Sequence, residues 1–196
     1  DFTAEMYADG HSFFTYLSDN ADSLSSCCRL RNEIQDNGFS YTLGAGGVST
    51  GSKSVLTINL NRCIQYAHRN NIPYLEFLEE MVDLTHKVQI CYNENLKYLL
   101  EKGMLPLFDA GYIAMSRQYL TIGINGLVEA AEYLHIPITD NPQYQNFVEE
   151  ILGLIETYNK RYRTKDLLFN CEMIPAENVG VKHAKWDRED GYFVPR

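Results

Sequence analysis

Apolar residues recur every three or four positions over two long stretches of the chain, and this spacing predicts amphipathic helices. The longer helix is expected over residues 74–102, with Gly103 as its stop, and the other over residues 143–160. A shorter helix is expected over residues 62–68, with Asn61 as its cap. The longer helix is expected to bury one apolar face, formed by Leu75, Leu78, Met81, Val82, Val88, Tyr92, Leu96 and Leu99.

Short apolar runs between these helices predict strands. The three runs lie at residues 55–60, 118–122 and 167–172, and a further short helix is expected over residues 8–17. Strands that alternate with helices are typical of parallel strands joined by helical crossovers, so we expect an α/β fold. Such folds bind their ligands at the carboxyl ends of the strands, where the segments that follow each run would lie.

Polar turns are expected at two of these strand ends. Residues 123–126 read Gly-Ile-Asn-Gly and precede a helix expected over residues 127–134, and residues 174–178 read Ile-Pro-Ala-Glu-Asn. A glycine turn between a strand and a helix points backbone N–H groups at a bound group, which favours an anionic or polar ligand. An equally open alternative is that Gly123 and Gly126 only allow the chain to turn.

A pair of adjacent cysteines, Cys27 and Cys28, lies in a stretch that is too short and too polar for a helix. We therefore place the pair on a loop or a strand end, close to the glycine-rich residues 39–52. These glycines match neither a phosphate-binding loop nor a dinucleotide fingerprint, because their spacing and the strand that follows are wrong for both. The thiol pair, the glycine-rich segment and a buried strand that carries Asn59 together suggest a closed site that shields reactive sulfur.

The composition narrows the classes of function. The 196 residues are 45% hydrophobic and 22% charged, which fits one large globular domain. A net charge of -9 and a pI near 5.0 argue against nucleic acid and anionic lipid as partners. No apolar run reaches the roughly 18 residues needed to span a bilayer, and no signal layout opens the chain, so a cytoplasmic location is expected.

The five cysteines form no Cys-x-x-Cys pair, which disfavours both a disulfide framework and a zinc site made by this chain alone. We expect reduced thiols and no bound metal. His86 and Cys91 are expected to have structural roles within the long helix, because isolated residues of these types are more often core or surface than ligands. A start at Asp1, without methionine, suggests a piece of a longer protein.

Five motifs are spread along nearly the whole chain, namely Ser26-Cys-Cys-Arg-Leu30, Gly44-Ala-Gly-Gly-Val48, Leu56-Thr-Ile-Asn-Leu-Asn-Arg62, Thr121-Ile-Gly-Ile-Asn-Gly126 and Glu172-Met-Ile-Pro-Ala-Glu-Asn178. Together and in this order they resemble the catalytic subunit of anaerobic (class III) ribonucleoside-triphosphate reductases, the glycyl-radical type. The resemblance implies a ten-stranded α/β barrel with a finger loop through its centre, whose tip carries a thiyl-radical cysteine. Residues 1–196 would then form part of the catalytic barrel domain, with the finger loop at about residues 23–52.

The resemblance also implies an activity, the reduction of ribonucleoside triphosphates to deoxyribonucleoside triphosphates by thiyl and glycyl radical chemistry. Cys28 is then the preferred radical cysteine and Cys27 the close alternative, since a shielded sulfur radical can take hydrogen from ribose C3′. Asn59 matches an asparagine near the substrate in formate-using members, and the alternative is a structural role at a strand end. The implied substrate-binding residues are Ser26, Gly123, Asn125, Gly126, Pro175, Ala176, Glu177 and Asn178.

Other parts of the family have no counterpart in this sequence, including the Arg-Val-Cys-Gly-Tyr-like segment that stores the glycyl radical and the four-cysteine zinc site. The resemblance therefore implies no cofactor within this chain. For the full-length family it implies that formate is often the reductant, that a radical S-adenosylmethionine activase is a partner, and that the protein forms a homodimer. The chain alone is expected to be inactive. Two alternatives stay open: a non-catalytic nucleotide-binding or regulatory module, and an assembly module whose helix over residues 74–102 exposes an apolar stripe.

Overall fold

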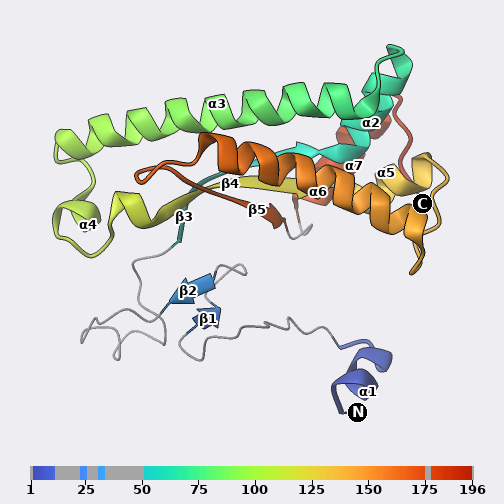
Figure 1. Cartoon of the computed structure of the whole chain (residues 1–196), viewed down its shortest axis with the longest axis horizontal. Coiled ribbons are helices and arrows are strands. Elements are labelled where there is room, and N and C mark those ends of the chain that lie inside the picture. Colours follow the sequence, from blue (N-terminus) through green and yellow to red (C-terminus); the bar gives the residue numbers. More distant parts are fainter. Residues whose placement is uncertain (1, 12–22, 26–30, 34–50, 175–177, 196) are drawn as a thin grey trace. The chain divides into compact units, whose positions relative to one another are not determined.

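A computed structural model describes residues 2–11, 23–25, 31–33, 51–174 and 178–195 of the chain. The chain divides into two compact units, Asp1–Gly51 and Ser52–Arg196 (Figure 1). Helices and strands alternate along the second unit, so this part has the mixed α/β architecture that the hydrophobic pattern predicts.

The first unit contains the helix α1 (Phe2–Ala8) and the strands β1 (Ser23–Ser25) and β2 (Arg31–Glu33), which pair antiparallel. The prediction of a helix over residues 8–17 was wrong for residues 9–11, the described residues beyond the end of α1. The helix ends at Ala8 because Gly10 adopts a φ of 86°, a left-handed conformation that stops a helix. Residues 12–17 lie outside the described residues, and so does most of the expected finger loop.

Three strands form the sheet of the second unit, in the order β3 (Gly51–Asn59), β4 (Gln118–Asn125) and β5 (Leu168–Met173). Strands β4 and β5 are parallel, and contacts at both ends show that β3 runs in the same direction as β4. The predicted parallel strands are therefore confirmed, whereas a ten-stranded barrel is an expectation that this three-stranded sheet does not show. Strand β3 begins four residues before its predicted start and ends one residue early, β4 ends three residues late, and β5 is shifted by one residue toward the C-terminus.

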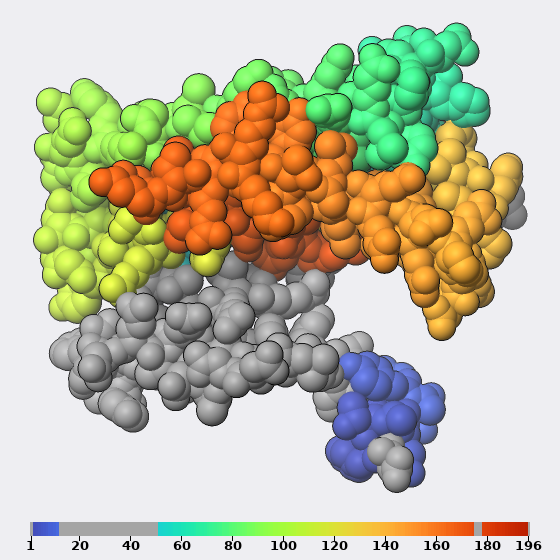
Figure 2. All heavy atoms as spheres, in the orientation of Figure 1, coloured from blue at the N-terminus to red at the C-terminus, as the bar shows by residue number. Residues whose placement is uncertain are grey.

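Two long helices lie side by side along the sheet, α3 (Tyr74–Glu101) and α6 (Pro142–Tyr162) (Figures 1 and 2). Both match their predicted ranges, and α3 ends before Gly103, whose φ is 67°. Within the described residues, every helix is either too short or too polar to span a membrane. The remaining helical elements are α2 (Leu60–Arg69), α4 (Pro106–Asp109), the 3-10 turn η3 (Met115–Arg117), α5 (Leu127–Tyr133) and α7 (Val179–Glu189).

The apolar core lies between one face of the sheet and the helices. Leu120, Ile122 and Ile124 alternate along β4 and are fully buried, as are Ile151 and Ile155 of α6. Because side chains alternate along a strand, the intervening residues of β4 belong to the opposite face. Strand β4 therefore separates an apolar face from a face that carries polar residues and glycine.

The predicted buried face of α3 is correct only for its first half. Leu78 and Val82 are buried, but Val88 is 46% exposed and Tyr92 is 43% exposed. The face turned inward along the second half is instead polar, and two of its side chains, Gln89 and His86, form hydrogen bonds to the sheet and to α6. Its buried members are Thr85, His86, Gln89 and Asn93.

Two of these polar side chains make well-defined contacts. The Nε2 atom of Gln89 donates to the carbonyl oxygen of Thr121 at 2.9 Å. Both ring nitrogens of His86 are engaged, one with the carbonyl oxygen of Val82 at 2.7 Å and the other with Oδ1 of Asn159 at 2.9 Å. The structural role expected for His86 is confirmed, and Cys91 lies on the exposed side of the helix.

Candidate functional site

The ends of β3 and β4 bring three of the predicted site residues together. Asn59 is the last residue of β3, Asn125 is the last residue of β4, and Gly126 follows it with a φ of 80°. A Cβ atom on Gly126 would lie 3.2 Å from Oδ1 of Asn59, so the two strand ends are in close contact. The structure therefore brings these three residues together at the carboxyl ends of the strands, and their roles in a site stay predictions.

Asn59 caps the helix that follows it. Its Oδ1 atom accepts a hydrogen bond of 3.1 Å from the backbone N–H of Arg62, which is the usual bond of an N-cap residue. The prediction that Asn61 caps this helix was wrong, because the helix already begins at Leu60. Asn61 is instead buried, and its Nδ2 atom donates to the carbonyl oxygen of Phe193 at 2.9 Å.

The amide nitrogen of Asn59 points to a buried carboxylate on α7. Its Nδ2 atom lies 3.1 Å from both carboxylate oxygens of Asp187, which is only 2% exposed. Asp187 also accepts from Nδ2 of Asn61 at 3.1 Å and from Nε of Arg62 at 2.7 Å. Sequence reasoning did not single out Asp187, because its partners lie more than a hundred positions away and no local pattern marks it.

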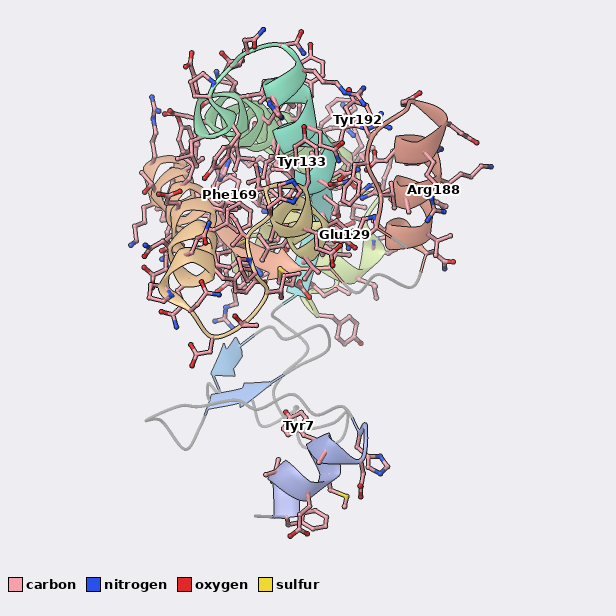
Figure 3. All side chains as sticks on the ribbon, turned by 90° about the vertical axis from the view of Figure 1, so that its right-hand side faces the viewer. Tyr7, Glu129, Tyr133, Phe169, Arg188 and Tyr192 are labelled. Carbon is pink, nitrogen blue, oxygen red and sulfur yellow. The ribbon has the colours of Figure 1, made fainter. Side chains whose placement is uncertain are left out.

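The chain after α7 is held against α2 by polar and aromatic contacts. Arg62 forms a second ion pair with Asp190 at 2.7 Å, and its guanidinium group lies 4.8 Å from the ring centre of Tyr192. Arg69 lies 3.9 Å from the same ring, which places Tyr192 beside α2 beyond the end of α7 (Figure 3). Burial opposes the charge of Arg62, but hydrogen bonds to Asp187 and Asp190 outweigh it and raise the pKa of Arg62.

A small cavity adjoins Asn59 at this corner of the molecule. Its volume is about 30 Å³, and its lining includes Asn125, Glu129 and His183. The Nδ1 atom of His183 is buried and has no hydrogen-bonding partner among the described residues. Burial lowers the pKa of His183, although the nearby Asp187 opposes this effect. The cavity has room for about one water molecule and is far too small for a nucleotide.

Gly123 lies within β4, not in a turn, so the predicted turn over residues 123–126 was wrong at its start. The residue pairs with Glu172 of β5 and is buried. A Cβ atom at this position would lie 2.7 Å from side-chain atoms of both Thr57 and Ile174. The physical reason for glycine here is close packing between three chain segments, and its predicted contact with substrate stays a prediction.

A row of hydrogen-bonded side chains crosses the sheet on the face that includes Gly123. The Oγ1 atom of Thr121 lies 2.8 Å from Oγ of Ser52 and donates to Oδ1 of Asn170 at 2.7 Å. These three residues come from the three different strands. Sequence reasoning missed this row, although Thr121 and Asn170 are polar residues within predicted apolar runs and could have indicated it; Ser52 precedes the run over residues 55–60.

The other predicted site residues have no contact that tests their roles. Asn178 is exposed and stands at the start of α7, where its side chain makes no capping hydrogen bond. Strands β1 and β2 pair Ser25 with Arg31, and the segment between these two residues lies outside the described residues. The same holds for residues 175–177, which follow β5 in the sequence. The predicted site residues in these two segments are Ser26, Cys27, Cys28, Pro175, Ala176 and Glu177.

Of the described cysteines, Cys63 and Cys171 are poor nucleophiles, and Cys91 lies on α3, away from the ends of β3 and β4. Burial, with a contribution from Asp187, raises the pKa of the Cys63 thiol to about 12, and burial raises that of Cys171 to about 11. A protonated thiol neither attacks nor binds metals readily. Among the described residues, no group of three or more His, Cys, Asp or Glu side chains could hold a metal ion.

The parallel sheet and its helices define an α/β protein, and its strand-end asparagines and glycine turn lie at the edge where such folds commonly bind polar ligands. The family model for anaerobic ribonucleoside-triphosphate reductase matches residues 2–195. The chain therefore belongs to the anaerobic ribonucleoside-triphosphate reductase family. A comparison with curated protein sequences gave no match.

Solved structures support this assignment. The chain is similar to the anaerobic ribonucleotide reductase from Thermotoga maritima with dATP bound in the specificity site, at 31% identity and a TM-score of 0.65 over 71% of this chain and 25% of that one. The same enzyme with glycerol in the active site matches at 30% identity and a TM-score of 0.67, over 74% of this chain and 25% of that one. The chain thus spans about a quarter of the length of these structures.

Proposed function

We propose that the protein to which this chain belongs reduces ribonucleoside triphosphates to deoxyribonucleoside triphosphates, and that this chain supplies part of its active site. The observation that carries the proposal is the meeting of Asn59, Asn125 and Gly126 at the carboxyl ends of adjacent parallel strands. Family membership supplies the reaction class, and the site lies where such folds bind ligands.

The proposed reaction replaces the 2′-hydroxyl group of the ribose by hydrogen. This change releases water and consumes two electrons, which formate would supply on oxidation to carbon dioxide. A sulfur radical on Cys28, or alternatively on Cys27, would take the hydrogen atom from ribose C3′ and return it after reduction. A glycyl radical formed by a radical S-adenosylmethionine activase would generate that sulfur radical, so we expect this chain alone to be inactive.

The side chain of Asn59 would contact the sugar. Among the residues that the structure describes, the backbone N–H of Arg62 donates to its carbonyl oxygen, and a carbonyl oxygen has capacity for two hydrogen bonds. In the proposed complex a ribose hydroxyl group would take the second position. The predicted substrate segments at Gly123–Gly126 and at residues 175–178 would then line the rest of the nucleotide.

The test uses the full-length protein, activated anaerobically with its activase and assayed for deoxynucleotide formation. We expect Cys28→Ala to abolish product while the glycyl radical signal in electron paramagnetic resonance stays intact, and Cys27→Ala to retain activity. Loss in the Cys27 variant alone would move the radical to that residue. Full activity in both variants would remove these cysteines from catalysis.

A second candidate function is suggested by α3. Leu84 is 51% exposed, and together with Val88 and Tyr92 it forms an apolar stripe at helical spacing on the outer side of the helix. This is the feature expected of an assembly module. The test is the double variant Leu84→Glu and Val88→Glu, with the oligomeric state measured by light scattering. The oligomer would become smaller if the stripe is an assembly surface, and its size would stay unchanged if the stripe has no role in assembly.

Measurements of nucleotide binding and of turnover together distinguish a catalytic protein from a non-catalytic nucleotide-binding module. One Thermotoga maritima relative is described in complex with dATP and CTP, at 31% identity and a TM-score of 0.64 over 71% of this chain and 25% of that one. We expect the full-length protein to bind nucleoside triphosphates and also to turn them over. Binding by calorimetry without any product after activation would favour the regulatory alternative. We also propose a homodimer and a cytoplasmic location for the full-length protein.

A further inference from the structure

We propose that Asp187 is a positioning residue that holds the side chain of Asn59 ready for the substrate, an inference that rests on the function proposed above. Asp187 lies in α7, and Asn59 ends β3 at a distance of 128 positions along the chain. The two side chains nevertheless meet through the amide nitrogen and both carboxylate oxygens. A contact between residues distant in the sequence, together with the local cap bond from Arg62, therefore determines where this asparagine points.

The carboxylate of Asp187 is organised by the corner between β3 and α2. It is almost completely buried, and its two oxygens receive hydrogen bonds from the side chains of Asn59, Asn61 and Arg62. A buried carboxylate is costly unless donors surround it, so this arrangement strongly favours a single position of the group. The carboxylate in turn fixes the donors that surround it.

Asn59 is held at both ends of its amide group. Its Oδ1 atom receives the backbone N–H of Arg62, and its Nδ2 atom donates to Asp187. Rotation of the amide by half a turn would place two donors together at one end and two acceptors together at the other. Asp187 therefore determines that Oδ1, with one remaining acceptor position, stays beside Gly126, where a ribose hydroxyl would be received.

Asp187 also connects two segments that are both predicted to contact the substrate. Helix α7 begins directly after residues 174–178, and the backbone N–H of Ile174 donates to the carbonyl oxygen of Ile124 at 3.1 Å. Asn125 reaches the carbonyl oxygen of Ile174 at 3.4 Å. Because Asn178 stands at the start of α7, a shift of this helix would displace Asn178 and the partner of Asn59 at the same time.

The test compares two carboxylate variants in the full-length, activated protein. Asp187→Asn keeps the shape of the side chain but replaces the carboxylate that faces the amide group of Asn59 by a second amide group. We expect kcat to fall at least tenfold, with a smaller change in KM. Asp190→Asn is the matched control, because Asp190 pairs with Arg62 from the same helix end and is 56% exposed. We expect the control to keep kcat within twofold of the wild type.

A double-mutant cycle separates positioning from general stabilisation. If Asp187 acts through Asn59, then Asp187→Asn added to Asn59→Ala lowers kcat no further than Asn59→Ala alone. Should Asp187→Asn fail to fold, Asp187→Glu takes its place in the cycle, since it keeps the charge and displaces the carboxylate by one methylene group.

Each outcome bears on a different claim. An Asp187 variant with wild-type kcat, or independent losses from the two positions, would overturn the positioning role. A wild-type protein that forms a glycyl radical but produces no deoxynucleotide would instead overturn the proposed function. In that case Asp187 would still be expected to affect the fit of a bound nucleotide, which calorimetry on the same variants measures.

Discussion

A Cβ atom on Gly126 would lie 3.2 Å from the Oδ1 atom of Asn59 and 3.1 Å from the backbone nitrogen of Asn61. The φ angle of 80° at Gly126 adds a second requirement for glycine, because a left-handed conformation costs other residues about 1–2 kcal/mol. The close approach of β3 and β4 at their carboxyl ends thus depends on the absence of a side chain. This explains why a glycine directly follows Asn125.

Replacement of Gly126 by alanine is expected to destabilise the protein by at least about 1–2 kcal/mol, from backbone strain before any crowding is counted. Chemical denaturation followed by circular dichroism measures the change. Gly153→Ala is the matched control, since Gly153 lies in α6 with no atom within 4 Å of the added Cβ. There we expect a gain of about 0.5–1 kcal/mol. Similar losses at both positions would contradict the role given to Gly126.

The two functions of the Asn59 side chain can be separated by substitution. Asn59→Ser keeps an oxygen that can cap α2 and removes the amide that donates to Asp187, whereas Asn59→Ala removes both. We expect the alanine variant to lose about 1 kcal/mol more stability than the serine variant. We expect both to lower kcat for deoxynucleotide formation in the full-length protein while leaving it measurable. A serine variant with wild-type kcat would show that the cap alone is required.

Local signals explain which elements the sequence could predict. The periodic apolar residues of α6 and the stop at Gly103 are local features, so both long helices could be located from them. The three strands could be located from their short apolar runs, which are local features too. The inward face of the second half of α3 could not, because Gln89 is buried only by virtue of its partner Thr121 in β4. Polar residues that find partners in another element have no signature in their own segment.

Local signals could also indicate part of the candidate site, namely the residues at the strand ends. Asn59, Asn125 and Gly126 stand at or directly after strand ends, and hydrophobic runs indicate approximately where a strand ends, although the run over residues 118–122 stops before Asn125. The choice between Asn59 and Asn61 as helix cap depended on where the strand stops, and element boundaries are the least reliable part of such a prediction. Asp187 could not be found, since its donors come from a segment more than 120 positions earlier.

Lys53 is expected to titrate well below an ordinary lysine. Partial burial, followed by the charge of Lys97, lowers the pKa of Lys53 from 10.5 to about 8, while Asp166 opposes the shift. The folded state therefore binds this proton less tightly than the unfolded state, so the contribution of Lys53 to stability rises as the pH increases from about 8 to 10.5. Competitive acetylation with mass spectrometry gives the midpoint. Lys97→Gln should raise it and Asp166→Asn should lower it, and shifts of opposite sign would contradict this account.

The described cysteines are expected to differ sharply in reactivity. Cys91 is exposed, whereas burial raises the pKa of Cys63 to about 12 and that of Cys171 to about 11, so very little of either is thiolate at pH 8. Iodoacetamide at pH 8, with digestion and mass spectrometry at timed intervals, should label Cys91 at least tenfold faster than the other two. Labelling in denaturant is the control, because unfolding exposes all three thiols and should bring their rates together. Rapid labelling of Cys63 in the native protein would show that the corner between α2 and α7 opens, and would weaken the case that Asp187 holds Asn59 in a single position.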